Sequence, residues 1–212
     1  MPSAETLWLF AIASAGLVLL PGPAVLYVVT RGIVHGVRGG LVSVIGVELG
    51  NVLQVIAATV GLAAVIASSA TAFTVVKYAG AAYLIYLGVR ALRSRHVAAP
   101  AAKHTGASPR RLFWEGFLVG SLNPKLALFL LAFLPQFIDP AAGPVWLQTL
   151  VLGLIFNLCA AVGDTLFALA AGAAGARVRA ILRGKRLATA SGVVYIGLGV
   201  SAAQAGVPAS SR

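Results

Sequence analysis

Three charged side chains lie well away from the ends of long apolar stretches in this 212-residue sequence: Glu48, Lys125 and Asp164. Lys125 stands near the middle of the apolar stretch Phe113–Phe137, roughly 18 Å of helix from its start. A charge at that depth in a lipid bilayer costs about 2.5–3.5 kcal/mol, and charged residues in such places generally face a cavity or a transport pathway. Lys125 is therefore a candidate site residue. The alternative is a structural ion pair with a buried acid.

Polar residues recur at helical spacing around the two acids. Glu48, Asn51 and Gln54 are three residues apart and predict one polar stripe on a helix. Asn157 and Asp164 are seven residues apart and share a face of another helix. Buried carboxylates on such faces could hold an ammonium group or relay protons. The alternative is hydrogen bonding between helices, which small polar residues often provide in membranes.

Two proline motifs interrupt the apolar stretches, Pro21-Gly22-Pro23 in the first and Asn123-Pro124-Lys125 in the fourth. Proline within a helix removes a backbone hydrogen bond and clashes with the preceding turn, so each motif predicts a kink or a break. Asn123 is suited to cap a new half-helix, with Pro124 as its first residue. The N–H groups at such helix starts carry partial positive charge and can bind a carboxylate. The alternative is a kink that serves packing alone.

The sequence as a whole has the composition of a membrane protein. It is 59% hydrophobic and 10% charged, with a mean hydropathy of +0.95, whereas soluble domains are about 45–50% apolar and about 25% charged. This composition excludes an ordinary soluble enzyme and a disordered chain. Six stretches could span a bilayer as helices, and none alternates as a barrel strand must. We therefore expect an all-α integral membrane protein with six transmembrane helices. The six stretches are Leu7–Val29, Gly40–Ala67, Val75–Leu92, Phe113–Phe137, Val145–Gly172 and Leu187–Ala205.

The excess of basic residues, a formal net charge of +11, is concentrated in three of the five connections between these stretches. The first, third and fifth connections, with the helix end next to them, contain thirteen of the sixteen Lys and Arg residues. The second and fourth connections contain none. Under the positive-inside rule the basic connections face the cytoplasm, and both chain termini lie outside. The charge thus marks the topology in a bacterial inner membrane rather than a surface for nucleic acid.

The connection from about residue 93 to residue 112 is rich in Ala, Pro, Ser and basic residues and is interpreted as a cytoplasmic linker. It separates two halves of three helices each, about residues 1–92 and 113–206. Because three is an odd number, the second half enters the membrane from the opposite side. We expect one transporter domain, residues 1–212, built as two inverted three-helix repeats. In that arrangement, interrupted helices at corresponding positions mark the binding site.

Other kinds of chemistry have no support in the sequence. The one cysteine, Cys159, excludes an internal disulfide and a Cys-x-x-Cys site. The apolar stretches contain no cluster of His or Cys residues and no nucleotide-binding fingerprint, so we expect no metal, no cofactor and no enzymatic activity. Two Gly-x-x-x-Gly pairs, Gly46/Gly50 and Gly116/Gly120, predict close helix packing and would permit a homo-oligomer.

Over about residues 5–200, these motifs together resemble the LysE/RhtB family of bacterial amino-acid exporters. Where relatives often have a histidine in the second helix this sequence has Gln54, which weakens a proton-relay role there. The resemblance implies efflux of amino acids or close derivatives from the cytoplasm, driven by an ion gradient, with the proton as the expected coupling ion in an antiport. The residues that carry the resemblance are Gly16, Pro21-Gly22-Pro23, Gly46-Val47-Glu48-Leu49-Gly50, Lys77-Tyr78-Ala79-Gly80-Ala81-Ala82-Tyr83-Leu84, Gly116-Phe117, Asn123-Pro124-Lys125, Phe133-Leu134-Pro135-Gln136-Phe137 and Asp164.

The sequence therefore predicts a secondary transporter for a zwitterionic amino acid, surrounded by lipid. The two helix starts and Lys125 are expected to hold the carboxylate, and Glu48 and Asp164 the amino group or the coupling proton. An exporter of small ions or metal cations is the alternative, and it requires more ligands than this chain offers. An enzyme or redox relay would require a nucleophile with its base, or a cysteine pair. The predicted substrate-binding residues are Pro21, Gly22, Pro23, Glu48, Asn51, Asn123, Pro124, Lys125 and Asp164.

Overall fold

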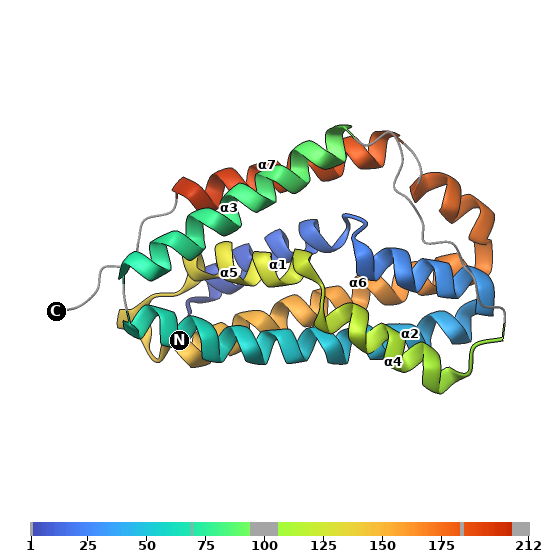
Figure 1. Cartoon of the computed structure of the whole chain (residues 1–212), viewed down its shortest axis with the longest axis horizontal. Coiled ribbons are helices and arrows are strands. Elements are labelled where there is room, and N and C mark those ends of the chain that lie inside the picture. The colour runs from blue at the N-terminus through green and yellow to red at the C-terminus, as the bar shows by residue number, and fades with distance from the viewer. Residues whose placement is uncertain (1, 69, 94–105, 183–184, 205–212) are drawn as a thin grey trace.

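The computed structural model describes residues 2–68, 70–93, 106–182 and 185–204, and every regular element in these ranges is a helix. The predicted all-helical class is confirmed for these ranges. Three helical segments are long and apolar enough to cross a membrane: Pro23–Gly61, Pro109–Phe137 and Val145–Ala174. The chain is a multi-pass membrane protein. Its elements in chain order (Figure 1) are α1 Ala4–Val18, α2 Pro23–Ser68, α3 Ala70–Arg93, α4 Pro109–Ser121, α5 Pro124–Ala132, the 3-10 turns Leu134–Phe137 and Pro140–Ala142, α6 Val145–Leu182 and α7 Lys185–Gln204.

The two proline motifs break their helices as predicted. Helix α1 ends at Val18 and α2 begins at Pro23, so the first apolar stretch forms parts of two helices. Helix α4 ends at Ser121 and α5 begins at Pro124. Each new helix thus starts on a proline, where the missing N–H would have had no intrahelical partner. Both breaks lie near the middle of the long axis of the bundle (Figure 1).

Helix α2 continues further than the sequence predicted. The connection predicted between Val29 and Gly40 contains the reversal of the chain, and the residues on both sides of Gly36 are helical. Gly36 has a φ of 70°, a conformation that glycine adopts without the steric cost of a side chain. The chain reverses there, and its returning part runs back along the bundle (Figure 1). The turn is tight, because a Cβ atom on Gly40 would lie 3.2 Å from the Cα atom of Gly32.

Helices α2 and α4 cross with their backbones in contact, through the two Gly-x-x-x-Gly pairs. A Cβ atom added to Gly46, Gly50, Gly116 or Gly120 would collide with backbone atoms of the facing helix. On Gly120 the collision is with the carbonyl oxygen of Val47. The predicted close packing is confirmed, and both pairs are used within the chain. This contact packs a helix of the first half of the sequence directly against a helix of the second half.

Small residues also permit the other close contacts of the bundle. Helix α6 packs along α2, where a Cβ atom on Gly32 would lie 3.1 Å from the carbonyl oxygen of Ala168. Helices α3 and α7 lie side by side (Figure 1), and a Cβ atom on Gly199 would lie 2.8 Å from the carbonyl oxygen of Ala81. A buried apolar cluster surrounds the first break and α5. It includes Phe10, Leu17, Leu126, Phe129, Leu152 and Phe156.

Large apolar side chains cover the outer faces of α2 and α6. Their exposed fractions reach 67% for Val60 on α2 and 65% for Leu158 on α6. Surfaces of this extent match the hydrocarbon of a bilayer better than water. The predicted linker, about residues 93–112, falls mostly outside the described residues, since 94–105 are not among them. The exposed large apolar residues described on the two helices are Ile45, Leu49, Leu53, Ile56, Val60, Trp146, Leu154, Leu158, Val162, Leu166 and Leu169.

Candidate functional site

Lys125 is held at the first break by backbone oxygens. Its own N–H donates to the side chain of Asn123, 3.1 Å away, which confirms Asn123 as the cap of α5. Its ammonium group donates to the carbonyl oxygens of Leu17 and Leu20, each 2.7 Å from Nζ. A helix end leaves such carbonyls without intrahelical partners, and here a buried lysine from the other half of the sequence satisfies them. These two partners could not be predicted from the sequence, because they lie at the end of α1 and just after it, far from Lys125 in the chain.

Two buried acids lie beside this lysine. The carboxylate of Asp164 interacts electrostatically with Lys125, and the carboxyl groups of Asp164 and Glu48 interact with each other. Glu48 also accepts a hydrogen bond from the side-chain amide of Asn51, 3.2 Å away. Three charged residues that lie far apart in the sequence, on α2, α5 and α6, are thus brought together inside the bundle.

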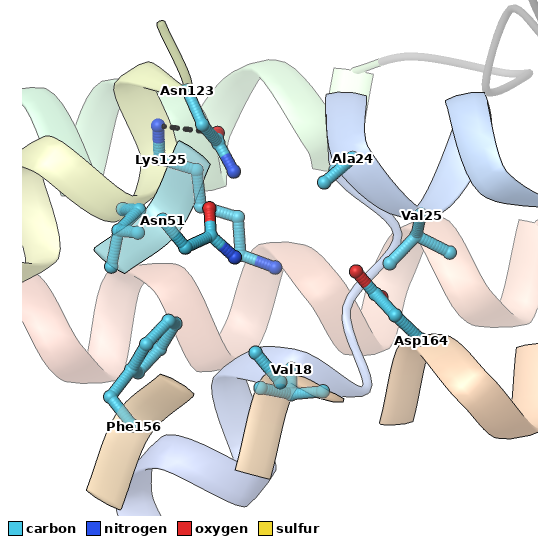
Figure 2. Close-up of a pocket in the computed structure, with 11 residues that line it drawn as sticks. Val18, Ala24, Val25, Asn51, Asn123, Lys125, Phe156 and Asp164 are labelled. Carbon is cyan, nitrogen blue, oxygen red and sulfur yellow. Dashed lines mark hydrogen bonds between the residues drawn. The ribbon is translucent and has the colours of Figure 1, made fainter. Parts of the chain in front are cut away.

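A small cavity of about 30 Å³ opens at this cluster, room for one or two water molecules. Figure 2 shows Asn51, Lys125 and Asp164 reaching into it from three different helices. A free amino acid is larger than this space. The lining residues are Val18, Gly22, Ala24, Val25, Asn51, Asn123, Lys125, Leu126, Phe156, Ala160 and Asp164.

The residues predicted as substrate-binding fall into two groups in the structure. Five line the cavity, and Glu48 contacts the lining residue Asp164. The prolines do not line it; they set where α2 and α5 begin. Gly22 gives the lysine side chain its space, because a Cβ atom there would lie 2.9 Å from the Cδ atom of Lys125. The five lining residues are Gly22, Asn51, Asn123, Lys125 and Asp164, and the prolines are Pro21, Pro23 and Pro124.

The polar stripe of α2 carries buried acceptor atoms without hydrogen-bond partners. They are Oε1 of Glu48, Oδ1 of Asn51 and Oε1 of Gln54, and Oδ1 of Asn157 on α6 is a fourth. Most buried polar atoms in folded proteins are paired, and an unpaired one costs about 1–3 kcal/mol. One of these residues, Asn51, lines the cavity, and an unpaired acceptor there favours a bound molecule that carries donors, such as water or an ammonium group.

Gln54 bridges the second break in the same way as Lys125 bridges the first. Its amide nitrogen donates to the carbonyl oxygens of Ser121 and Asn123, at 2.7 and 3.1 Å. Each break is therefore spanned by a side chain from the other half of the sequence. Sequence analysis placed Gln54 on the polar stripe but predicted no partner for it, because the helix end that it caps lies 67 residues away.

The sequence matches the family described as LysE type translocator over residues 15–206. The chain belongs to this family. Its relatives include a leucine efflux protein of Enterobacter sp., 36% identical over 71% of this chain and 72% of that protein. A homoserine/homoserine lactone efflux protein of Salmonella typhimurium is 38% identical over 69% of this chain and 72% of that protein. An uncharacterized membrane protein of Pseudomonas aeruginosa is 33% identical over 93% of this chain and 94% of its own length. No solved structure matches the sequence.

A second cluster of charges in this LysE-type translocator joins α2 to α4 at the end of the bundle beyond the cavity. Glu115 accepts from Arg31 at 2.6 Å and from Arg111 at 2.7 Å. The Tyr27 hydroxyl donates to the carbonyl oxygen of Leu112 at 2.8 Å, and the Arg31 guanidinium lies 5.1 Å from the centre of the Tyr27 ring. Sequence analysis treated the two arginines as topology markers and did not predict this cluster, because positions 84 residues apart are paired.

The described residues contain no group of three or more His, Cys, Asp or Glu side chains arranged to hold a metal ion. The acids of the cavity, Glu48 and Asp164, are accompanied by a lysine and an amide instead.

Proposed function

We propose that this LysE-type translocator exports amino acids or close derivatives from the bacterial cytoplasm. The observation that carries the proposal is the meeting of Lys125, Glu48 and Asp164 beside a cavity between two broken helices. A zwitterion needs both signs of charge close together, and this cluster supplies both. The efflux of leucine and of homoserine by relatives so named supports the substrate class.

Each end of the substrate has a complementary part of the site. The starts of α2 and α5, with the charge of Lys125, hold the carboxylate, because helix starts favour anions. The first residues of α2, Ala24 and Val25, line the cavity in support of this role. Glu48, Asp164 and Asn51 hold the ammonium group. The unpartnered acceptor atoms of Glu48 and Asn51 support this second role.

Transport would proceed by alternating access in a single domain, residues 1–212, of six transmembrane helices in two inverted repeats. The repeats are about residues 1–92 and 113–206, joined by a cytoplasmic linker, with both termini outside the inner membrane. Prolines at the start of a half-helix in each repeat support this arrangement. Efflux is proposed to run in antiport with protons, carried by Glu48 or Asp164, because these are the buried acids of the site.

The cluster around Glu115 would close the cytoplasmic entrance. Replacing Glu115 by glutamine leaves the half-buried Arg31 without a carboxylate and weakens the closed form by about 1–2 kcal/mol. The population of the open form should rise about five- to thirty-fold.

The measurement is the rate at which a water-soluble maleimide labels Ala24→Cys in a Cys159→Ala background. Arg111→Ala is the matched control, since it removes only the more exposed ion pair, and should change the rate less than about two-fold. Equal rates in all three proteins would contradict a closing role.

An export screen tests the proposed function. Cells that produce the protein and cells that do not are loaded with leucine, homoserine and a panel of other amino acids, and the medium is analysed over time. At least one amino acid should appear several-fold faster in the medium of the producing cells. If no amino acid does so while the protein is present in the membrane, the proposal fails. Greater tolerance of cadmium, nickel or manganese would instead favour the alternative of a cation exporter.

A further inference from the structure

The ammonium group of Lys125 is bound by oxygen atoms of the kind that bind free cations. They are the backbone carbonyl oxygens of Leu17 and Leu20, each 2.7 Å from Nζ. They stand at the C-terminal end of α1, where the helix dipole adds partial negative charge. The carboxylate of Asp164, on α6, also attracts this ammonium electrostatically. The group is 93% buried from solvent, since the exposed fraction of Lys125 is 7%.

Transporters with broken helices commonly bind their coupling cation at this kind of place, where unwound carbonyls and the C-terminal end of a half-helix converge. We propose that Leu17, Leu20 and Asp164 form a monovalent-cation site, and that the ammonium of Lys125 is its built-in occupant. The ligand class of the site is therefore a primary ammonium or a small monovalent cation. In the native chain the lysine ammonium occupies the position that a bound cation would take.

The second break provides an internal comparison. There the carbonyl oxygens of Ser121 and Asn123 are capped by the neutral amide of Gln54. A neutral donor is thus sufficient to satisfy the carbonyls of a broken helix in this fold. The presence of a full positive charge at the first break needs another reason, and the adjacent carboxylate of Asp164 provides it. The cation site is specific to the first break.

The site also connects the two halves of the chain. Lys125 belongs to α5, whereas Leu17 lies in the last turn of α1 and Leu20 in the break after it, more than 100 residues earlier. Withdrawal of the ammonium would leave two carbonyls and a carboxylate without a cation, a costly state inside a bundle. Among the described residues, Asp164 attracts this ammonium electrostatically, and Glu48 in turn interacts with Asp164. Movement of α1 against α5 therefore requires another cation to replace the lysine.

The test is cation binding by Lys125→Ala, measured without any substrate. Thermal unfolding of the purified protein is followed in methylammonium chloride, sodium chloride and choline chloride at equal ionic strength. Methylammonium or sodium at about ten times its dissociation constant should raise the unfolding midpoint of Lys125→Ala by about 3–5 °C over choline, which is too large for the site. The wild type, whose site is filled, should show no such difference. Neither should Lys125→Ala/Asp164→Asn, which lacks the carboxylate.

Arg110→Ala controls for the loss of one positive charge, since Arg110 is exposed at the start of α4, and should respond like the wild type. If Lys125→Ala does not survive extraction, the same salts are compared by the fraction of monodisperse protein recovered, which should rise with methylammonium or sodium. A Lys125→Ala protein that responds to neither cation, or a wild type that responds equally, would overturn the proposal. Because no amino acid is present, either result leaves the proposed export function untouched.

Discussion

Lys125→Met is expected to lower the efflux rate about 10- to 150-fold. The substitution keeps the length and apolar packing of the side chain but removes the ammonium that donates to Leu17 and Leu20. Hydrogen bonds to a charged group contribute about 1.5–3 kcal/mol each, and the substrate carboxylate would lose its cation as well. The measurement is the initial rate of export from loaded cells, divided by the amount of protein in the membrane.

Arg110→Met is the matched control for this prediction. Arg110 is also a basic residue of the second half, but its side chain is exposed at the start of α4 and does not line the cavity. Its export rate should stay within about two-fold of the wild type, as expected for an exposed side chain away from the site. A Lys125→Met protein that exports at the wild-type rate, with normal abundance, would remove Lys125 from the centre of the mechanism.

Gly120→Ala is expected to have the largest effect on stability. The new methyl group would collide with the carbonyl oxygen of Val47, so α2 and α4 must move apart along their glycine crossing. Overpacking typically costs about 1–3 kcal/mol; a collision with backbone falls at the upper end, about 2–3 kcal/mol, or about 4–12 °C in the unfolding midpoint. The measurement is thermal unfolding in detergent.

Gly61→Ala provides the comparison within α2. A Cβ atom there meets no other atom within 4 Å, and alanine is favoured over glycine inside a helix by about 0.5–1 kcal/mol. Its midpoint should therefore be unchanged or slightly higher. Equal midpoints for Gly120→Ala and Gly61→Ala would show that the α2–α4 backbones do not touch as described.

Features that depend on local chemistry were predictable from the sequence. Proline cannot continue a helix, so the breaks before Pro23 and Pro124 followed from residue type alone. Asn123 was expected as a cap because its side-chain oxygen can accept a hydrogen bond from an N–H group at a helix start. The buried stripe from Glu48 to Gln54 followed from its spacing, because neighbours three residues apart share a helix face.

Features that depend on which helices meet were not predictable in this way. The carbonyl partners of Lys125 lie 105 and 108 residues away, and no periodicity connects them. A connection was predicted between Val29 and Gly40, but its form, a helix that reverses at Gly36, was not, because an apolar profile does not separate a loop from such a turn. The ion pair between Glu115 and Arg31 was not predicted, because it depends on how α4 packs against α2. Pairing across the bundle is a property of packing, which single-sequence patterns do not contain.

The measurement that tests the central account most directly is efflux from proteoliposomes. Purified protein is reconstituted into vesicles loaded with radiolabelled leucine or homoserine, and release is followed with and without an inward proton gradient. The account predicts release well above that of protein-free vesicles, faster with the proton gradient and lost in Lys125→Met. Release equal to that of protein-free vesicles for leucine, homoserine and the wider amino-acid panel would contradict it.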